Sequence, residues 1–376
     1  MKRIAVFGGT FNPVHNEHVK TVAAAINELK LDKLFIVPTF LPPHKNVSPA
    51  SSTDRINMLK IAFRGFDNVE ISDFELLNAG KSYSFITAEH FRGLYPDAEI
   101  FMIVGGDMLK DFKTWKNPER ILNAVRIAAV FREDYAFDEK AEREYFKSVF
   151  GKDFVLLNFV GKTVSSTEIR TYLVFNIKPQ GVSDEVFDYI KARNVYSPDV
   201  YQKYVLERLP FKRVIHTANV VVAALKKAKE LGLDYEKVRI AATLHDCAKY
   251  DDYKDYAGFK LPDDVPLPVV HAFLGAFIAE TVLGVKDKEI LDAIRYHTSG
   301  KAEMSTLSKL IFVADMVEKG RDYEGVDILR AEYEKDFESC FRLCLKEEVQ
   351  HLINKKQYIY AETLNAYDYY VKNKRS

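Results

Sequence analysis

Two histidines, His15 and His18, follow a glycine pair in the segment KRIAVFGGTFNPVHNEH, which covers residues 2–18. The apolar run before the glycines predicts a strand, and the stretch after the histidines, to about residue 31, predicts a helix. Backbone N–H groups of a tight loop and a helix N-terminus attract anions, and Gly8 and Gly9 let an anion approach the backbone closely. We therefore expect a phosphate cradle with both imidazoles facing the same anion. The alternative is a strand and a helix with two surface histidines.

This loop differs from the two commonest phosphate-binding loops. It lacks the G-K-[ST] of a Walker loop, and its glycines are adjacent instead of spaced as G-x-G-x-x-G. With Thr10, Phe11 and Pro13, the segment resembles the signature of nucleotidyltransferases, which move a nucleotide monophosphate from a triphosphate. That family usually has H-x-G-H, whereas Glu17 replaces the glycine here, so the nucleotide can sit slightly differently.

The second half of the chain carries histidines and aspartates that could bind metal: His216, His245, Asp246, His271, His297 and Asp315. In RIAATLHDCAK the His-Asp pair interrupts an apolar helix face, where burial without partners would be costly. Imidazoles with carboxylates suit first-row ions such as Fe, Mn or Co, and the lack of cysteine at these positions argues against structural zinc. We expect one ion at His216, His245, Asp246 and Asp315, and a second at His271 and His297 if Asp246 bridges. The alternative is a set of satisfied or surface histidines.

Length and composition limit the classes of protein. A chain of 376 residues should form two or more domains, and its 54 basic and 54 acidic residues give no basic excess for nucleic acid or an anionic membrane. The longest apolar runs are far shorter than the ~20 residues of a membrane-spanning helix, and the N-terminus has no signal-peptide pattern. Three cysteines without a C-x-x-C pair favour a soluble protein in the reducing cytoplasm.

In the first half, strand-length apolar runs alternate with helical stretches, which predicts an α/β fold with a doubly wound parallel sheet. The runs lie at 2–7, 33–38, 69–72, 99–105, 126–131 and 154–158. Ligands of such sheets bind beyond the carboxyl ends of the strands. Polar and aromatic residues follow the strands there and are the candidate binding residues: Gly8, Gly9, Thr10, Phe11, Thr39, His44, Lys45, Tyr83, Thr87, Gly106, Asp107, Trp115, Arg132, Ser165, Ser166 and Arg170.

The motifs GGTFNPVHxxH, VPTxxPPHK, SYSFIT, GGDMLxxFxxW and SSTEIR, in that order, resemble nicotinate-nucleotide adenylyltransferase over residues 1 to about 195. The resemblance implies a Rossmann-like nucleotidyltransferase domain whose ATP phosphates are held by His15, His18, Ser165, Ser166 and Arg170. It also implies that Lys45, with Thr10 or His44, holds the phosphate of nicotinate mononucleotide. Trp115 would stack on the pyridine ring, and Thr87 would contact its carboxylate.

The implied reaction needs no nucleophile from the protein. The mononucleotide phosphate attacks the α-phosphorus of ATP in line, pyrophosphate leaves, and Mg²⁺ bridges the phosphates. Catalysis is then positioning and charge stabilisation, for which His15, His18 and Arg170 are suited.

Beyond a polar link near residues 194–200, strand-like runs disappear, so residues 196–376 should form a second, all-helical domain. We expect helices at about 201–209, 212–231, 234–250, 268–284, 287–297, 303–317, 324–354 and 360–372. The segments HDCAK, YHTSG and LIFVADMVEKGRDYEGV resemble the HD superfamily of metal-dependent phosphohydrolases. They are most similar to the bacterial members that split diadenosine tetraphosphate into two ADP.

The HD resemblance implies that water activated by two ions attacks phosphorus, with Asp246 at the reacting centre and Lys249 or Arg321 steadying the leaving charge. Lys249 and Arg321 could equally be surface residues. No G-Y-P follows the distal histidine, which argues against a cyclic dinucleotide phosphodiesterase.

The leading hypothesis is therefore a bifunctional enzyme whose partners are ATP, nicotinate mononucleotide and a dinucleoside polyphosphate. As alternatives, the HD half hydrolyses another nucleotide, or it is a metal-bound nucleotide sensor that regulates the first domain without catalysis. For the first half, the alternative acceptors are pantetheine phosphate and the amidated mononucleotide, although Trp115 and SYSFIT favour the pyridine acid. A homo-oligomer is left open.

Overall fold

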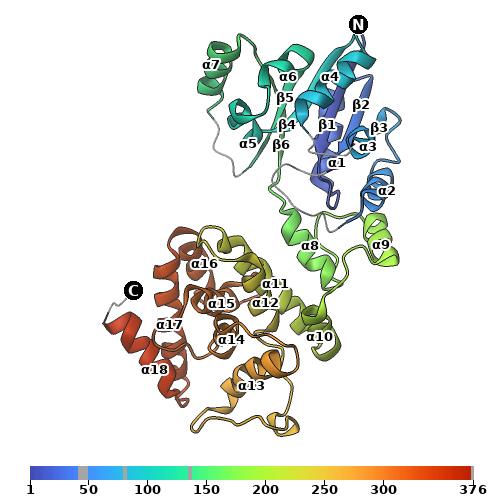
Figure 1. The fold of residues 1–376 in the computed structure, drawn as a ribbon. Helices are drawn as coiled ribbons and strands as arrows, with labels where there is room; N and C mark the ends of the chain where they lie inside the picture. Colours follow the sequence, from blue (N-terminus) through green and yellow to red (C-terminus); the bar gives the residue numbers. More distant parts are fainter. Residues whose placement is uncertain (41–49, 79–82, 134–137, 374–376) are drawn as a thin grey trace. The chain divides into compact units, whose positions relative to one another are not determined.

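A computed structural model describes residues 1–40, 50–78, 83–133 and 138–373 of the chain. Contacts between residues divide the chain into two compact units, Met1–Ser197 and Pro198–Ser376 (Figure 1).

The first unit is built on a parallel sheet with the order β3-β2-β1-β4-β5-β6. Its strands are β1 (Arg3–Gly9), β2 (Lys33–Pro38), β3 (Val69–Ile71), β4 (Glu99–Gly105), β5 (Arg126–Arg132) and β6 (Val155–Gly161). The chain leaves β1 toward β2 on one side and returns to β4 on the other, so the strand order reverses at the carboxyl end of β1. A crevice forms at such a reversal in doubly wound sheets.

Helices cover both faces of this sheet (Figure 1). They are α1 (Asn16–Leu29), α2 (Ser52–Ala62), α3 (Phe74–Leu77), α4 (Ser84–Leu94), α5 (Gly106–Lys110), α6 (Pro118–Ala124), α7 (Glu139–Phe150), α8 (Ser166–Val174) and α9 (Asp184–Arg193), with a 3₁₀ turn at Phe112–Thr114. Successive residues of β1 point to opposite faces: Ala5 joins one core cluster with α1, α2, α8 and α9, whereas Ile4 and Val6 join the other with α4 and α6. Both faces are therefore buried, and the predicted doubly wound α/β fold is confirmed.

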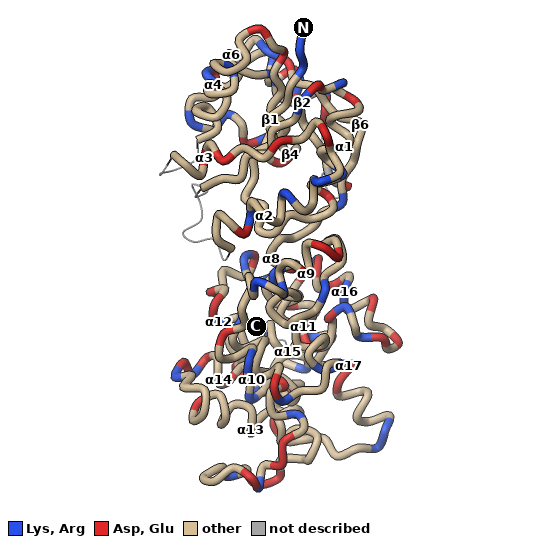
Figure 2. The backbone as a smooth tube through the Cα atoms, turned by 90° about the vertical axis from the view of Figure 1, so that its right-hand side faces the viewer, with Lys and Arg blue, Asp and Glu red and all other residues tan. Residues whose placement is uncertain are grey.

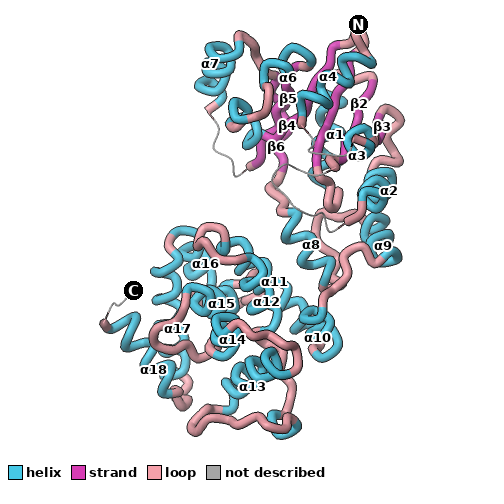
Figure 3. Tube along the Cα trace, in the orientation of Figure 1, coloured by secondary structure: helices cyan, strands magenta, loops and turns pink. Residues whose placement is uncertain are grey.

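Within its described residues, the second unit consists of helices, turns and loops (Figure 3). Its helices are α10 (Val200–Arg208), α11 (Phe211–Ala228), α12 (Tyr235–Leu244), α13 (Leu267–Thr281), α14 (Lys288–Arg295), α15 (Thr306–Val317), α16 (Val326–Lys335), α17 (Phe337–Asn354) and α18 (Ala361–Tyr367), with a 3₁₀ turn at Tyr253–Asp255 and a π-helical end at Asp368–Lys372. The predicted all-helical fold of this half is confirmed.

Three predicted helix boundaries are wrong. The single helix expected at 324–354 is two helices, because Asp336 adopts an extended backbone and its carboxylate caps α17 by accepting from Ser339 N. The helix expected at 234–250 ends at Leu244, so His245 and Asp246 lie in the turn that follows α12. His297 likewise lies two residues beyond the end of α14.

Basic and acidic residues are interspersed along both units in Figure 2. Among the described residues, no helix is both long and apolar enough to cross a membrane. Cys247, Cys340 and Cys344 are free and buried.

Candidate functional sites

The loop after β1 and the start of α1 bring His15 and His18 together. His15 caps α1, and its ring stacks on that of His18 with 3.6 Å between centroids. The backbone N–H of His15 donates to His18 Nδ1 at 3.1 Å. Because Nδ1 accepts, a neutral His18 carries its proton on Nε2 and presents a donor there. Such an N–H suits a phosphate oxygen.

Glycine at position 9 is required by the packing of this loop. A Cβ atom there would lie 2.9 Å from the Phe11 ring, which is buried beneath the loop. Phe11 itself has a positive φ of 47°. The loop backbone is therefore shaped by a close approach that a larger residue at position 9 would disturb.

Two arginines hold the same loop by its carbonyl oxygens. Arg170 Nη1, from α8, donates to Asn12 O at 2.9 Å, and Arg55 Nη1, from α2, donates to Thr10 O at 3.0 Å and Thr39 O at 2.7 Å. Among the described residues, no carboxylate forms an ion pair with Arg55, which is 1% exposed. Burial lowers the pKa of both guanidiniums, but arginine stays protonated at neutral pH. The loop thus has a positive environment suited to an anion.

Glu17 connects the start of α1 to the segment that leads to α8. Its Oε2 accepts from Lys162 N at 2.9 Å, and its Oε1 pairs with Lys20 at 2.7 Å. Lys162 lies just beyond β6, in the passage to the N-terminus of α8. The residue that departs from the usual H-x-G-H pattern therefore joins two segments of the predicted phosphate site.

The residues predicted from SSTEIR lie at the N-terminus of α8. Ser165 caps this helix by accepting from Glu168 N at 3.3 Å, and Ser166 is its first residue. The helix also carries Arg170, so this N-terminus and the loop after β1 belong to one region. His44 and Lys45 lie outside the described residues, and for Arg132 only its position at the end of β5 is described.

The residues expected around the pyridine ring lie beyond β4 and at the start of α4. Trp115 is half-buried against Phe112, with 5.1 Å between ring centroids. Lys116 Nζ lies 4.2 Å from the centre of the Tyr83 ring, so the segments that carry Tyr83 and Trp115 are neighbours. Thr87 is buried, and its hydroxyl donates to Glu75 Oε1 at 2.5 Å. Its contact with a substrate carboxylate stays a prediction.

Gly106 and Asp107 begin α5 directly after β4. Gly106 is buried, and a Cβ atom there would overlap the Phe131 ring of β5. The chain therefore turns from β4 into α5 against the side of β5, which leaves Asp107 at the carboxyl edge of the sheet.

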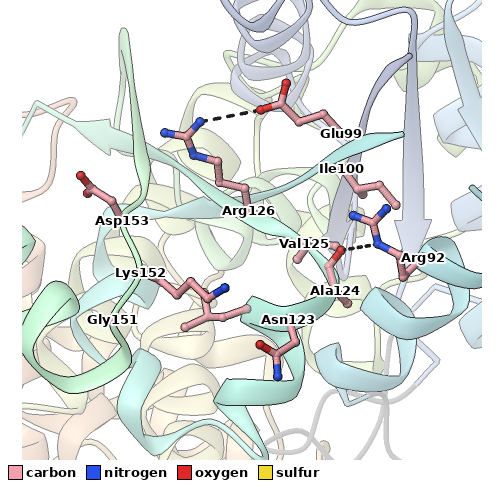
Figure 4. A pocket seen from close by; sticks show the side chains of 11 residues that line it. Arg92, Glu99, Ile100, Asn123, Ala124, Val125, Arg126, Gly151, Lys152 and Asp153 are labelled. Atoms are coloured by element: carbon pink, nitrogen blue, oxygen red, sulfur yellow. Dashed lines mark hydrogen bonds and ion pairs between the residues drawn. The ribbon is translucent and has the colours of Figure 1, made fainter. Parts of the chain in front are cut away.

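A cavity of about 460 Å³ lies elsewhere in the first unit (Figure 4). Its lining includes Glu99 and Arg126, the first residues of β4 and β5, which pair at 3.7 Å, and Arg92, whose Nε donates to Ala124 O. The cavity is therefore at the amino ends of the strands, opposite to the predicted site.

In the second unit, three helices and two turns bring the predicted ligands together. His216, His245 and Asp246 form one group whose potential ligand atoms lie within 4.8 Å of one another, and Asp246, His271 and His297 form a second. Asp315 Oδ1 lies 3.0 Å from His216 Nε2. Asp246 is common to both groups, as expected of a bridging carboxylate.

Within this cluster, acceptor atoms face one another, an arrangement that a cation would stabilise. His245 Nδ1 and His297 Nδ1 face the carbonyl oxygens of Ala242 and Ile294 at 2.7 and 2.8 Å, so Nδ1 carries the proton in each. Their Nε2 atoms are then acceptors, yet His297 Nε2 lies 3.4 Å from Asp246 Oδ1. This buried oxygen has no hydrogen-bond partner of good geometry among the described residues. A metal ion between these acceptors would satisfy them.

His245, His271, Asp246 and Asp315 are in the protonation states that metal binding needs. Burial lowers the pKa of His245 to about 3, and burial lowers that of His271 as well, so both are neutral ligands at pH 7. Burial would raise the pKa of Asp246, but the neighbouring imidazoles outweigh it and hold that pKa well below its usual range. Asp315 is also ionised, because His216 and Arg321 lower its pKa against the effect of burial. Burial would lower the pKa of His216, but hydrogen bonds to Asp315 and Glu318 outweigh burial and raise it, so a metal ion there would compete with a proton.

Known proteins resemble both halves. Residues 6–172 match the cytidylyltransferase-like family, and residues 213–320 match the HD domain. A Clostridium tetani protein named "Probable nicotinate-nucleotide adenylyltransferase" is 38% identical over 172 residues, which are 45% of this chain and 86% of that protein. The chain belongs to the nicotinate-nucleotide adenylyltransferase family.

Two further relatives match most of the length of this adenylyltransferase-family chain. Both are named "Probable nicotinate-nucleotide adenylyltransferase/Ap4A hydrolase". The protein of Mycoplasma genitalium is 29% identical over 337 residues, 87% of this chain and 91% of that protein. The protein of Mycoplasma pneumoniae is 28% identical over 351 residues, 91% of this chain and 97% of that protein. The predicted combination of an adenylyltransferase-like half and an HD half is thus confirmed, and the HD domain implies binding of divalent metal.

Several residues near the sites of this adenylyltransferase-family chain escaped the sequence prediction. Arg55 holds the loop after β1. In the HD half, Arg213 Nη1 pairs with Asp246 Oδ2 at 2.8 Å from one helical turn before His216. Glu318 Oε1 lies 3.1 Å from His216 Nδ1. The role of an arginine or glutamate outside a motif cannot be predicted from the neighbouring sequence, because its partner lies far along the chain.

The two cations predicted to steady the leaving charge also have partners in the protein. Arg321 binds Asp315 through Nε to its carbonyl oxygen at 2.7 Å and through Nη2 to its carboxylate. Lys249 Nζ lies 3.0 Å from His271 Nε2 and 3.5 Å from Asp246 Oδ1. Both therefore border the cluster, and their contact with substrate stays a prediction.

Proposed function

We propose that this chain is a bifunctional cytoplasmic enzyme. Its first half transfers adenylyl from ATP to nicotinate mononucleotide, and its HD half hydrolyses diadenosine tetraphosphate to two ADP. The adenylyltransferase family to which the chain belongs and the names of its two long relatives support this pair of activities.

The first activity is supported by one observation. The Nε2–H group of His18 is a donor in the loop after β1, and the Asn12 carbonyl oxygen of this loop accepts a hydrogen bond from Arg170. In the reaction, a phosphate oxygen of the mononucleotide forms a bond to the α-phosphorus, while the bond from that phosphorus to the β-bridging oxygen breaks. Pyrophosphate leaves with the bonding electron pair. His15, His18, Arg170 and the N-terminus of α8 bind and orient the triphosphate and stabilise its growing charge, and Mg²⁺ accompanies ATP.

The first activity is tested by supplying ATP and Mg²⁺ with each acceptor in turn: nicotinate mononucleotide, its amide or pantetheine phosphate. We expect nicotinate adenine dinucleotide and an equal amount of pyrophosphate. Transfer to the amide or to pantetheine phosphate at a higher kcat/KM would reassign the acceptor.

The second activity is supported by the acceptor atoms that face one another around Asp246, because they could bind two metal ions. His216, His245, Asp246 and Asp315 would hold one ion and His271, His297 and Asp246 the other, with Fe favoured over Mn or Co. When bound, such ions supply Lewis acidity and lower the pKa of water near the phosphorus. Asp246 orients both positions, and Arg213, Lys249 and Arg321 add positive charge at the rim.

The second activity is tested on protein loaded with Fe or Mn. We expect diadenosine tetraphosphate to yield only ADP, and Asp246→Asn to abolish turnover. Asp263→Asn is a matched control, because Asp263 is exposed in the loop before α13. If the tetraphosphate stays intact while another nucleotide is hydrolysed, the substrate must be reassigned. If no nucleotide is turned over but one changes the adenylyltransferase kinetics, the HD half is a sensor.

A further inference from the structure

We propose that Glu318 is a positioning residue that strengthens one of the two metal positions of the HD half. It does so by holding His216 as a stronger ligand for the ion at His216, His245, Asp246 and Asp315. The inference rests on the proposed dinuclear site and goes beyond it, because it predicts which ion binds more tightly and why.

The geometry places a carboxylate directly behind one ligand. Glu318 follows α15, is 3% exposed, and its Oε1 lies 3.1 Å from His216 Nδ1. A carboxylate accepts, so Nδ1 carries the proton of His216. The other ring nitrogen, Nε2, then points its lone pair toward Asp315 Oδ1 at 3.0 Å and His245 Nε2 at 3.3 Å, where the ion would bind.

The surrounding chain is built to hold this carboxylate. Gly320 N–H donates to Glu318 Oε2 at 2.5 Å. A Cβ atom at Gly320 would lie 3.0 Å from that oxygen and 3.0 Å from Asn219 Nδ2, so the turn closes tightly only with glycine. Asn219 lies one helical turn after His216 on α11.

Arg330, from α16, fixes the backbone of the same turn. Its Nη2 donates to Glu318 O at 2.8 Å and to Arg321 O at 2.7 Å, and its Nε donates to Val317 O at 3.0 Å. Glu318 therefore has little freedom to leave His216, and the imidazole is held in one orientation.

The histidines of the cluster differ in the group that accepts from Nδ1. His245 and His297 donate from Nδ1 to the neutral carbonyls of Ala242 and Ile294. A carboxylate partner makes an imidazole a more basic metal ligand than an amide carbonyl does. Because Asp246 serves both positions, it does not distinguish them. Asp315 adds a carboxylate to the position at His216, and Glu318 strengthens His216 itself, so the ion at His216 should bind more tightly than the ion at His271 and His297.

The test is a calorimetric titration of metal-free, full-length protein with Mn²⁺. Wild type should bind two ions in two steps of unequal affinity. Glu318→Gln keeps the size of the side chain but removes its charge and cannot accept from both His216 and Gly320. It should weaken the tight step about 10–100-fold and leave the weak step unchanged. Glu338→Gln is the matched control, because Glu338 pairs with Lys309 instead of a ligand.

A second variant keeps the test valid if Glu318→Gln does not fold. Gly320→Ala retains the carboxylate but pushes it from its place, so the tight step should weaken by less than in Glu318→Gln. Equal weakening of both steps, or no change in either, would overturn the role of Glu318 while leaving a two-ion site intact. A wild-type protein that binds fewer than two ions would overturn the dinuclear proposal together with this inference.

Discussion

At the scale of single residues, the two sites use histidine in opposite ways. His18 accepts at Nδ1 and offers a proton at Nε2, whereas His216, His245 and His297 are protonated at Nδ1 and offer a lone pair at Nε2. The first arrangement suits a phosphate oxygen and the second a metal ion. The partner of Nδ1 thus decides what each imidazole can bind.

His18→Ala should lower kcat for adenylyl transfer about 10²–10³-fold, the usual effect of removing one preorganised donor to developing charge. KM for nicotinate mononucleotide should change much less, because the imidazole is proposed to bind the triphosphate. Steady-state kinetics with each substrate varied would measure both constants. His351→Ala, at an exposed position on α17, is the control. Losses of equal size in turnover and mononucleotide binding would contradict the assignment.

Glu17 should stabilise the first unit in a pH-dependent way. Burial would raise its pKa, but hydrogen bonds from Lys20 and Lys162 N–H outweigh burial and lower it. A carboxyl group with a depressed folded-state pKa contributes stability above its unfolded pKa of about 4.3 and loses it as the pH falls through the folded value. Glu17→Gln should therefore cost on the order of 1 kcal/mol at pH 7 and less at pH 3.

Urea unfolding of wild type and Glu17→Gln at both pH values would measure this difference. A cost that is the same at pH 3 and pH 7 would show that the charge of Glu17 is not what joins α1 to the segment after β6.

At the scale of elements, the strand-to-helix passages decide the geometry of the first site. β1 leads to α1, β4 to α5 and β6 to α8, and each passage brings its polar residues to the carboxyl edge of the sheet. Neighbouring elements pack so closely at these passages that glycine fits where a larger residue would displace one of them.

Gly106→Ala should destabilise the first unit by about 1–3 kcal/mol, because its Cβ atom would overlap the buried Phe131 ring. Gly93→Ala is the matched control: Gly93 is exposed on α4, and a Cβ atom there would contact nothing within 4 Å. That change should instead stabilise α4 by about 0.5–1 kcal/mol. Denaturant unfolding would compare the two, and equal effects would mean that the β4–α5 passage can relax.

At the scale of the whole molecule, each unit has its own core and its own candidate site. The first unit packs helices on both faces of a sheet, while the second packs helix on helix around the cluster of histidines and aspartates. Ligands of one unit should therefore stabilise that unit.

Removal of metal with a chelator should lower the melting temperature of residues 198–376. The adenylyltransferase activity, assayed after the chelator is removed and Mg²⁺ is restored, should be unchanged. Metal at 100 times its dissociation constant should add about 2.7 kcal/mol to the stability of the HD half. Differential scanning calorimetry of the full-length protein, with and without Mn²⁺, would measure the shift. His351→Ala should respond like wild type, whereas a metal-independent melting temperature would argue against binding at this cluster.

Much of this architecture is determined by local patterns in the sequence. Apolar runs predicted all six strands, because a strand buried on both faces needs uninterrupted apolar residues, and the motif residues follow those strands. Spacing also separated the helical half from the sheet. Boundaries were less accurate. The break at Asp336 coincides with a capping hydrogen bond that apolar periodicity does not reveal, and Cys247 and Ala248 beyond the end of α12 are buried as helix residues would be.

Only the tertiary structure decided which polar residues meet. Arg55 with the loop after β1, Arg213 with Asp246, and Glu318 with His216 are pairs from separate elements. A buried charge needs its partner in space, and that partner can lie anywhere in the chain. The amino-acid sequence determined which residue types and which strands and helices were available. Folding determined which of them became neighbours, and hence which nitrogen of each histidine can bind a ligand.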